Sequence, residues 1–282
     1  MQMGKIIDGK KIAANILKEV AEEIKNRKLK ITLAVVLVGE HTPSLTYVRK
    51  KAEAAKKVGI NFQLHHLPAN ISKKILVQKI HNIQKDNHLG GLIVQLPLPE
   101  PLYTTEVLNA INPKFDVDCL TDTNLGKLVM KTGLILPPTP GAVKAILKIL
   151  NIKLKGKRVV IIGAGALVGK PLAIILLNKE ATVTVANRYT KNLKEICRQA
   201  DIIVTAVGKK NLLTADLVKR GVVVIDTGIC FVRGKMYGDV DFPSVSKKAR
   251  YITPVPGGVG PITVSLLLKN TLKLTKHRLG LI

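Results

Sequence analysis

The 282-residue sequence predicts an α/β protein of two domains, each built around a parallel sheet. Two observations lead to this fold class. Continuous apolar runs of strand length, such as residues 31–39, alternate with stretches in which apolar residues recur at helical spacing, a pattern typical of parallel sheets covered by helices. Residues 135–143, ILPPTPGAV, then break the alternation with closely spaced prolines, and we expect a domain boundary there.

The first half of the chain predicts an αβα domain. Its first helix is indicated by apolar residues at helical spacing, namely Ile12, Ile16, Val20 and Ile24. Strands are expected at residues 31–39, 60–68 and 90–99, and helices between them at residues 44–60 and around Ile75 to Ile83. Because strands alternate with helices, we expect the strands to lie parallel and to be covered on both faces.

The second half predicts a doubly wound domain. After a helix at 142–150 come a strand, a glycine turn and a helix at 156–177, then strands within 181–190, 200–208 and 221–229, and a Pro/Gly loop at 253–261. We therefore place the first domain at residues 1–136 and the second at residues 137–261. We expect the C-terminal helix, residues 262–282, to return to the first domain and complete it.

The composition favours a soluble protein with anionic partners. Lys and Arg number 45 against 19 Asp and Glu. The net charge of +26 would attract nucleic acids as well as phosphorylated or carboxylated small molecules. The basic residues are spread along the whole chain, however, and only 3% of residues are aromatic, so base-stacking surfaces are scarce. A general bias toward lysine explains the charge better, and no nucleic-acid partner is expected.

The sequence gives no sign of a disulfide framework, a metal site or a membrane segment. The three cysteines lie far apart with no CxxC spacing. His65 and His66 are adjacent in a predicted strand, so their side chains point to opposite faces. Every long apolar run is interrupted, and the N-terminal stretch lacks the apolar core of a secretory signal. We expect a cytoplasmic protein without a structural metal or a membrane partner.

A glycine turn marks a candidate nucleotide site. Gly163, Ala164 and Gly165 follow the apolar run VVII and open a helix. Glycine lets the backbone approach a pyrophosphate there, and the helix N-terminus favours negative charge. The next glycine is Gly169, so the spacing is GxGxxxG, and an ordinary tight strand–helix turn is the alternative. The strand–turn–helix context favours a Rossmann-type dinucleotide site.

The end of the following strand indicates which dinucleotide binds. It carries Asn187 and Arg188, with Lys191 nearby, and it has no carboxylate to bind a ribose hydroxyl. A guanidinium there suits a 2′-phosphate through charge-assisted hydrogen bonds. We therefore predict NADP rather than NAD, with an ordinary surface charge at Arg188 as the alternative.

Residues 44–60, SLTYVRKKAEAAKKVGI, have the composition of a solvated Ala/Lys helix, but they include a tyrosine and a lysine on one face. Tyr47 and Lys51 are four residues apart, whereas Lys50 and Arg49 turn away from them. A lysine can move protons near neutral pH when desolvation or neighbouring positive charge lowers its pKa. The helix therefore carries one candidate for chemistry among its lysines.

Three polar residues follow the strands of the first half. Gln95 stands at the end of a predicted strand, where active sites of parallel sheets collect, and capping of loose backbone groups is its alternative role. Asp116 and Asp118 share a face if their segment is extended. Either could instead serve an Asx-type turn.

Four stretches together resemble the bifunctional methylenetetrahydrofolate dehydrogenase/cyclohydrolase family, the FolD-type proteins. They are YVRKK (47–51), VQLPLP (94–99), DVD (116–118) with PPTPG (137–141) behind it, and TPVPGGVGP (253–261). The resemblance covers nearly the whole chain, from IIDGKKIAANI at 6–16 to the final helix.

The resemblance implies two reactions at one folate site. NADP takes a hydride from 5,10-methylenetetrahydrofolate, and the resulting 5,10-methenyl compound is hydrolysed to 10-formyltetrahydrofolate. The implied enzyme is a homodimeric oxidoreductase and hydrolase of one-carbon metabolism and purine biosynthesis. Its partners are tetrahydrofolate derivatives, with polyglutamated forms left open.

The resemblance also implies roles for single residues. Lys51 is the catalytic lysine, which Gln95 orients; Tyr47 packs against the pterin, and Asp118 accepts hydrogen bonds from it. The implied substrate-binding set adds Ser44, Leu96, Pro256, Gly257 and Gly258, and the cofactor-binding set is Gly163, Ala164, Gly165, Arg188 and Ile229. We expect the loop that contains Pro256 to lie between the domains and to touch both folate and nicotinamide.

The chain departs from the family pattern at three positions. Gly165 stands where a serine is usual, Cys119 where a glycine usually follows the DVD motif, and Pro138 where a cysteine is frequent. None of these changes removes a residue to which the family assigns chemistry. Another two-domain NADP dehydrogenase, similar to shikimate dehydrogenase, is the alternative, but it does not explain YVRKK, VQLPLP or PVPGGVGP.

Overall fold

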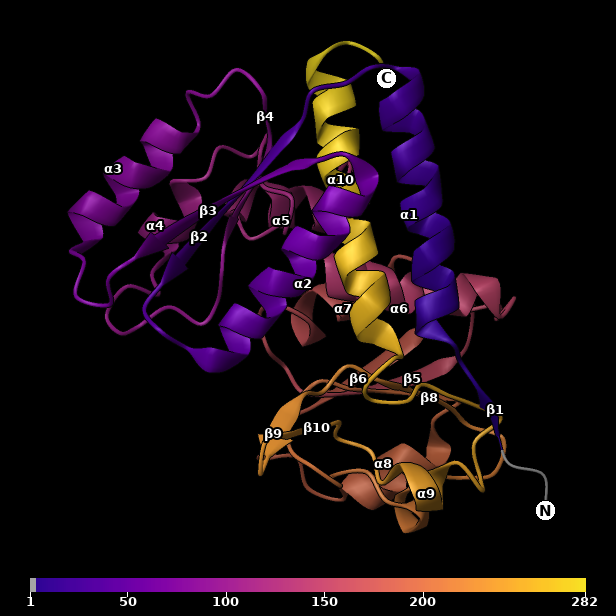
Figure 1. Cartoon of the computed structure of the whole chain (residues 1–282). Coiled ribbons are helices and arrows are strands. Elements are labelled where there is room, and N and C mark those ends of the chain that lie inside the picture. The colour runs from indigo at the N-terminus through magenta and orange to yellow at the C-terminus, as the bar shows by residue number, and fades with distance from the viewer. Residues whose placement is uncertain (1–3) are drawn as a thin grey trace. The chain divides into compact units, whose positions relative to one another are not determined.

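The computed structural model describes residues 4–282, which divide into two compact units. One unit holds Ala14–Pro138 together with Val264–Ile282 and is called the three-stranded unit after its sheet. The other holds the residues up to Ala13 together with Thr139–Thr263 and is called the six-stranded unit. Both sheets are parallel and carry helices, so the predicted α/β class is confirmed (Figure 1).

The three-stranded unit has the sheet order β3-β2-β4. Its strands are β2 (Thr32–Val38), β3 (Asn61–Leu67) and β4 (Leu89–Val94). Its helices are α1 (Gly9–Asn26), α2 (Thr42–Val58), α3 (Lys73–Ile83), α4 (Thr105–Asn109), α5 (Asp122–Val129) and α10 (Val259–Arg278), of which α1 and α10 begin in the other unit.

The central strand β2 is buried along its whole length because both faces of the sheet are covered. Its odd-numbered side chains, such as Leu33 and Val35, join a core with α1, α2 and α10. Its even-numbered side chains, such as Ala34 and Val36, join a second core with α3 and α4. This two-sided burial explains why the strand reads as an unbroken apolar run in the sequence.

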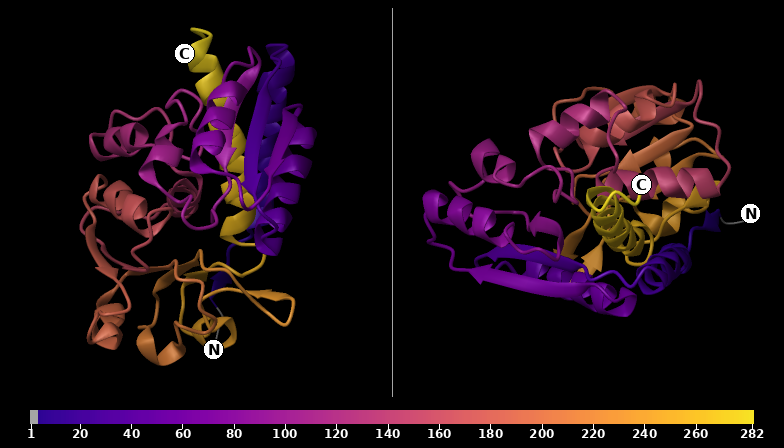
Figure 2. Two further views of the ribbon diagram at one scale, coloured as in Figure 1. Left: turned by 90° about the vertical axis from the view of Figure 1, so that its left-hand side faces the viewer. Right: turned by 90° about the horizontal axis from the view of Figure 1, so that it is seen from above.

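The C-terminal helix α10 completes the core of the three-stranded unit. Leu268 and Leu272 lie in the same core as β2. On its polar side, Lys269 pairs with Glu19 of α1 at 2.9 Å, and Lys276 pairs with Glu23. The two helices run side by side in Figure 1 and in both views of Figure 2. The predicted return of the C-terminal helix to the first domain is therefore confirmed.

The six-stranded unit has the sheet order β1-β11-β8-β7-β5-β6. Its strands are β1 (Lys5–Ile6), β5 (Arg158–Ile162), β6 (Thr182–Ala186), β7 (Ile202–Thr205), β8 (Val223–Asp226) and β11 (Tyr251–Ile252). Its helices are α6 (Pro138–Ile149), α7 (Gly169–Leu177), α8 (Leu193–Gln199), the 3₁₀ turn η1 (Ala215–Leu217) and α9 (Phe242–Val245), and a hairpin joins β9 (Cys230–Val232) to β10 (Lys235–Tyr237).

The N-terminal segment groups with the six-stranded unit. The sequence predicts residues 1–136 as one domain, of which residues 1–3 lie outside the described part of the chain. Lys5 and Ile6 form β1, which pairs in parallel with β11, and the residues up to Ala13 therefore belong to that unit. The predicted limits of the functional domains, at 136/137 and 261/262, stay a prediction.

Residues 4–282 contain neither a membrane-spanning helix nor a cluster of metal-ligating side chains. No helix among these residues is long and apolar enough to cross a membrane. The same residues contain no group of three or more His, Cys, Asp or Glu side chains that could hold a metal ion.

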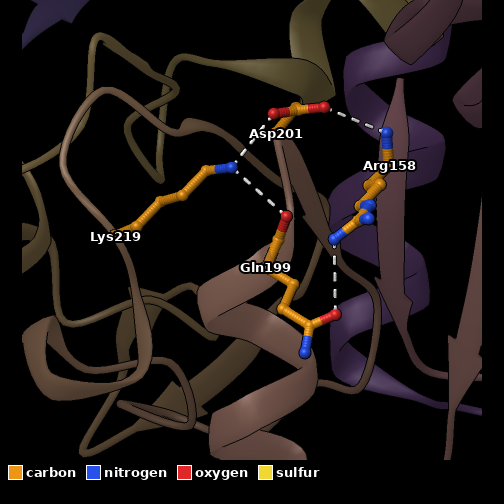
Figure 3. A network of polar contacts seen from close by, with 4 residues as sticks. All are labelled: Arg158, Gln199, Asp201 and Lys219. Atoms are coloured by element: carbon orange, nitrogen blue, oxygen red, sulfur yellow. Dashed lines mark hydrogen bonds and ion pairs between the residues drawn. The ribbon is translucent and has the colours of Figure 1, made fainter. Parts of the chain in front are cut away.

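A polar network joins the loops at the amino ends of the six-stranded sheet (Figure 3). The Asp201 carboxylate accepts hydrogen bonds from the backbone N–H of Arg158 at 3.1 Å and from Lys219 Nζ at 3.0 Å. Lys219 also donates to the Gln199 carbonyl at 3.2 Å. Partial burial opposes the charged carboxylate, but the hydrogen bonds and nearby lysines outweigh it and hold the pKa of Asp201 below its ordinary value.

We expect Asp201→Asn to lower the free energy of unfolding at pH 7 by about 1 kcal/mol, because the site is partly exposed and its charge-assisted hydrogen bonds are screened. A carboxyl group whose pKa is depressed by folding stabilises the protein above its unfolded pKa, and this stabilisation is lost as the pH falls through the folded value. The difference between wild type and variant in urea denaturation should therefore shrink between about pH 5 and pH 3. A difference that stays constant over this range would show that the charge of Asp201 contributes nothing.

Candidate active site and nucleotide-binding turn

Helix α2 carries the two aligned residues Tyr47 and Lys51. Pro43 stands in its first turn, and Gly59 ends it in the left-handed conformation, donating its N–H to carbonyls of the last turn. Val48 and Ala55 face the core, so the helix is held against the sheet by one side. Tyr47 and Lys51 are partly buried, whereas Lys50 is exposed.

Lys51 is fixed by the residue that follows β4. Its Nζ donates a hydrogen bond to Gln95 Oε1 at 2.9 Å. The other end of the Gln95 amide donates to the Leu96 carbonyl at 2.8 Å, and the Gln95 backbone N–H donates to Val36 O of β2 at 2.9 Å. The glutamine is thus held at both its backbone and its side chain, and its oxygen is presented to the lysine.

The lysine amine and a carboxylate influence each other in this buried region. Burial lowers the pKa of Lys51, and the Asp118 carboxylate opposes that effect. Burial likewise raises the pKa of Asp118, which Lys51 opposes and Asp116 reinforces. An amine with a lowered pKa carries its neutral form closer to neutral pH, which is the property that proton transfer requires.

Asp116 and Asp118 differ in the hydrogen bonds that their side chains accept. The Asp116 side chain is fully buried and accepts from Leu120 N, Thr121 N, Thr121 Oγ1 and Asn124 Nδ2, at 2.7–2.9 Å. No described residue donates a hydrogen bond to the Asp118 carboxylate. Asp116 therefore performs the turn role that the sequence left open for both residues, and Asp118 keeps its oxygens free.

The Tyr47 hydroxyl is a buried polar atom without a partner. No described residue forms a hydrogen bond with its oxygen, and burial raises its pKa. The hydroxyl of Ser44, one turn earlier on α2, forms a hydrogen bond with His41 Nδ1 at 2.8 Å. It also donates a hydrogen bond to the Leu96 carbonyl at 3.5 Å. The structure thus brings together Ser44, Tyr47, Lys51, Gln95, Leu96 and Asp118 in the three-stranded unit.

One residue that supports this region was not predicted from the sequence. Asn270 of α10 is buried and donates both N–H groups of its amide, to Val117 O at 3.0 Å and to Leu136 O at 2.8 Å. It therefore holds the segment that carries Asp118. The available signal was an amide side chain in the middle of the final helical stretch SLLLKNTLKL.

Cys119 takes the place of the glycine that is usual after the DVD motif. Its φ of 56° lies in the left-handed region that favours glycine, so the turn keeps its shape despite the side chain. The thiol is buried, and burial together with the neighbouring carboxylates raises its pKa. The cysteine is therefore a packed, protonated thiol rather than a nucleophile.

The glycine turn of the six-stranded unit leads from β5 to α7. Gly163 has a φ of 119°, and a Cβ there would lie 2.3 Å from Ala206 O. A Cβ at Gly169, the first residue of α7, would lie 1.8 Å from Gly163 O. A Cβ at Gly165 would meet nothing within 4 Å, so the serine of the family pattern would fit there. Gly163 and Gly169 are thus the glycines that the geometry requires.

Arg188 presents an exposed guanidinium just after the end of β6. It follows β6, and its guanidinium lies 4.7 Å from the centroid of the Tyr189 ring. Both side chains are exposed. Asn187 Oδ1 accepts a hydrogen bond from Tyr189 N at 2.9 Å, which shapes the turn after the strand. The guanidinium is therefore available to an anion at the carboxyl end of the sheet.

The Pro/Gly loop belongs to the six-stranded unit. Gly257 has a φ of 106°, and a Cβ at Gly258 would lie 2.5 Å from Pro254 O. Gly9 packs against this loop, since a Cβ there would lie 1.7 Å from Gly258 O. Contact of Pro256, Gly257 and Gly258 with folate stays a prediction, because Lys51 and its neighbours lie in the other unit.

Two family models together match nearly the whole chain. Residues 7–118 match the family model described as tetrahydrofolate dehydrogenase/cyclohydrolase, catalytic domain. Residues 137–279 match the model described as tetrahydrofolate dehydrogenase/cyclohydrolase, NAD(P)-binding domain. The chain belongs to this family. Lys51, Gln95 and Asp118 thus lie within the catalytic match. The glycine turn lies within the NAD(P)-binding match.

Relatives of the tetrahydrofolate dehydrogenase/cyclohydrolase family cover nearly the whole chain. The protein named bifunctional protein FolD from Lactobacillus acidophilus is 45% identical over 99% of both chains. The crystal structure of the Campylobacter jejuni enzyme has a TM-score of 0.93 and 45% identity, covering 97% of this chain and 99% of that one. The Trypanosoma brucei enzyme, complexed with NADP and an inhibitor, has a TM-score of 0.95 and 37% identity, covering 99% of both.

The alternative family is distant. Shikimate 5-dehydrogenase from Listeria monocytogenes has a TM-score of 0.52 and 12% identity, covering 87% of this chain and 92% of that one. That likeness shows a shared fold alone. The resemblance stated from the sequence motifs is therefore confirmed, and the reading as a shikimate-dehydrogenase-like enzyme is not favoured.

Proposed function

We propose that this chain is a bifunctional one-carbon folate enzyme. It oxidises 5,10-methylenetetrahydrofolate to 5,10-methenyltetrahydrofolate with NADP, and it hydrolyses that product to 10-formyltetrahydrofolate. The observation that carries the proposal is the contact of the buried Lys51 amine with Gln95, beside an Asp118 carboxylate whose oxygens are free. Family membership over the whole chain supports the same reactions.

We assign folate-binding roles to polar side-chain groups that have no hydrogen-bond partner among the described residues. The Asp118 carboxylate can accept N–H donors of a pterin, and the orphan Tyr47 hydroxyl lies beside the lysine on α2. The Tyr47 ring offers a flat apolar surface for a heterocycle. We assign folate binding to two groups of residues. The three-stranded unit contributes Ser44, Tyr47, Gln95, Leu96 and Asp118, and the six-stranded unit contributes Pro256, Gly257 and Gly258.

Hydrolysis needs a group that moves protons. The neutral Lys51 amine takes a proton from the water that attacks the methenyl carbon. The ammonium that results can return a proton to the ring nitrogen that leaves when the ring opens. Gln95 holds the amine without pairing with it as a carboxylate would, so it does not stabilise the charged form as strongly.

The residues of the six-stranded unit fit NADP. Gly163 and Gly169 allow the tight turn at the N-terminus of α7, where a pyrophosphate would bind, and Gly165 between them has open space around it. Arg188 is exposed at the strand end where a 2′-phosphate would bind. When bound, the cofactor accepts the hydride of the first reaction. We assign Gly163, Ala164, Gly165, Arg188 and Ile229 to its binding.

The direct test is a spectrophotometric assay with 5,10-methylenetetrahydrofolate and either NADP or NAD. We expect the nicotinamide to be reduced with NADP, and the methenyl compound to form and then be hydrolysed. Supplied methenyl compound should be hydrolysed without any cofactor turnover. Reduction without accelerated hydrolysis would contradict the second activity, and absence of both would contradict the proposal.

Arg188→Ala is expected to raise the KM for NADP far more than that for NAD. The 2′-phosphate is the only group that differs between the cofactors, and a charge-assisted guanidinium contact strengthens only NADP binding. The NADP/NAD ratio of kcat/KM should fall about tenfold or more, as expected for a loss of roughly 1.5–3 kcal/mol. Diffuse attraction from the net charge acts on both cofactors and is screened at moderate salt. An unchanged ratio would make Arg188 an ordinary surface charge.

The cellular setting is part of the proposal and rests on the family resemblance. We place the enzyme in the cytoplasm as a homodimer, where 10-formyltetrahydrofolate would supply purine biosynthesis, and its substrates are tetrahydrofolates, including polyglutamated forms. Sedimentation equilibrium tests the oligomer, since a dimer has twice the 30.6 kDa mass of the chain. A single species at the monomer mass across micromolar concentrations would contradict it.

A further inference from the structure

Two buried carboxylates lie at the carboxyl edge of the six-stranded sheet and have no part in the proposed chemistry. Asp226 is the last residue of β8, and Asp239 follows the β9–β10 hairpin. Their exposed fractions are 3% and 0%. Buried charges are retained in proteins when hydrogen bonds satisfy them, so the partners of these two indicate their purpose.

Asp239 uses both carboxylate oxygens on a single short loop. Its Oδ2 accepts a hydrogen bond from Val207 N at 2.7 Å, and its Oδ1 accepts one from Lys209 N at 2.7 Å. Gly208, between these residues, has a φ of 81°. Charge-assisted bonds of this length are strong and directional. The carboxylate therefore clamps the loop Ala206–Lys209 at two points.

Asp226 supports the clamp from behind. Its carboxylate accepts from Thr205 Oγ1 at 2.8 Å and from the backbone N–H of Asp239 at 3.2 Å and of Val240 at 3.0 Å. It thus ties the end of β7 to the segment that carries Asp239. The arrangement leaves no space for side chains: a Cβ at Gly238 would lie 2.0 Å from Asp226 Oδ2, and one at Gly228 would lie 2.0 Å from the Asp239 carboxyl carbon.

The clamped loop lies opposite the glycine turn. In the sheet, β5 is flanked by β6 on one side and β7 on the other. The chain therefore leaves β5 and β7 at a topological switch point, where α/β sheets bind nucleotides. The contact is direct, because a Cβ on Gly163 would lie 2.3 Å from Ala206 O, and Ala206 N donates to Ile162 O at 2.7 Å. On its other side Gly208 approaches the carbonyl of Ile229, a predicted cofactor residue.

We propose that Asp239 is a positioning residue of the NADP site, with Asp226 fixing it from behind. It pre-forms the loop Ala206–Lys209 as the wall that faces the glycine turn, so that the cofactor binds without having to order that loop. This inference rests on the proposed NADP-dependent function, and it assigns a role to two side chains that need not touch the cofactor themselves.

The test is Asp239→Asn in the full-length protein, with NADP affinity measured by isothermal titration well below the unfolding temperature. Asparagine keeps the shape of the side chain, but its NH2 group would face the N–H of Val207 or of Lys209. Because both groups are donors, one of the two hydrogen bonds would be lost. We expect the Kd and the KM for NADP to rise about tenfold or more, as for loss of a charge-assisted hydrogen bond. The KM for 5,10-methylenetetrahydrofolate should stay within about twofold.

Two carboxylates provide matched controls. Asp241→Asn changes a neighbouring residue whose carboxylate accepts a hydrogen bond only from Ser244 Oγ, on α9, among the described residues. Asp201→Asn loosens the opposite, amino edge of the same sheet. Both should leave the NADP affinity within about twofold. If Asp201→Asn lowered the NADP affinity as much as Asp239→Asn does, the loss would be due to general destabilisation of the unit, and the inference would be overturned.

Amide exchange in the wild type gives a result that does not depend on a variant folding. Without cofactor, the amides of Val207 and Lys209 should exchange as slowly as those of β7, and NADP should change them little. Fast exchange that slows only on adding NADP would overturn the inference, as would unchanged NADP affinity in Asp239→Asn. A wild type that binds no NADP would instead contradict the proposed function, and the inference with it.

Discussion

Lys51→Met is expected to abolish hydrolysis of the methenyl compound while leaving the fold intact. Methionine keeps most of the length of the lysine stem and removes the amine that moves protons. The rate should fall by about 10²–10⁴-fold, the usual contribution of a positioned acid–base group. Oxidation of the methylene compound should suffer less, because that step is a hydride transfer. The two rates are measured separately, by loss of supplied methenyl compound and by reduction of NADP.

Lys50→Met is the matched control for this variant. The residue is adjacent on α2 but exposed, and its Nζ lies 5.9 Å from the centroid of the Tyr47 ring rather than beside Gln95. A mild effect is expected on both activities. Equal losses from the two substitutions would mean that the chemistry lies on the other face of the helix.

The pH dependence of hydrolysis carries the same information. Burial lowers the pKa of Lys51, and the neutral amine is the form that accepts a proton. The hydrolysis rate should therefore rise with pH through a value below that of an ordinary lysine. Gln95→Glu should move this rise to higher pH, because a carboxylate beside the amine stabilises its charged form.

The long periodic elements could be predicted from the sequence, and the short ones could not. Strand β2 is an unbroken apolar run because both faces of its sheet are buried, so its place was visible without the structure. Strands β1 and β11 have two residues each and exist only through their pairing with each other and with β8. The hairpin of β9 and β10 and the short helices α4 and α5 likewise carry too few residues for a period to show.

The residues of the candidate site were within reach of sequence reasoning, but their partners were not. The spacing of Tyr47 and Lys51 predicts one helix face, whereas the bond from Lys51 to Gln95 spans 44 residues and needs the fold. The roles of Asn270 and Asp239 depend on which backbone groups are left without partners, and no sequence pattern records that. Residue types predicted the chemistry, and the backbone decided which side chains support it.

The two aspartates of the DVD motif show the same division. In the sequence they are equivalent, two residues apart in an extended segment. In the structure Asp116 accepts four hydrogen bonds from its own turn. Asp118 lies in the electrostatic field of Lys51, and none of residues 4–282 donates a hydrogen bond to its carboxylate. Only one of them can therefore receive a ligand without breaking the turn.

Asp118→Asn is accordingly expected to weaken folate binding and to leave NADP binding unchanged. A charged acceptor for pterin N–H groups becomes a neutral amide that carries donors of its own. Loss of a hydrogen bond to a charged group costs on the order of 1.5–3 kcal/mol, so the Kd for a folate substrate or inhibitor should rise roughly 10- to 150-fold. Isothermal titration with folate and with NADP, on the same preparation, measures both affinities.

Asp116→Asn separates binding from folding in this experiment. Its buried carboxylate accepts hydrogen bonds from Leu120, Thr121 and Asn124. In the variant the NH2 group of the amide would face one of these N–H or O–H donors, so the unfolding temperature should fall. Asp118 accepts no such bond from the described part of the chain, and its substitution should act mainly on folate affinity. If Asp118→Asn bound folate normally and only unfolded at a lower temperature, Asp118 would be a second turn residue, and the pterin would have to be recognised by another group beside Lys51.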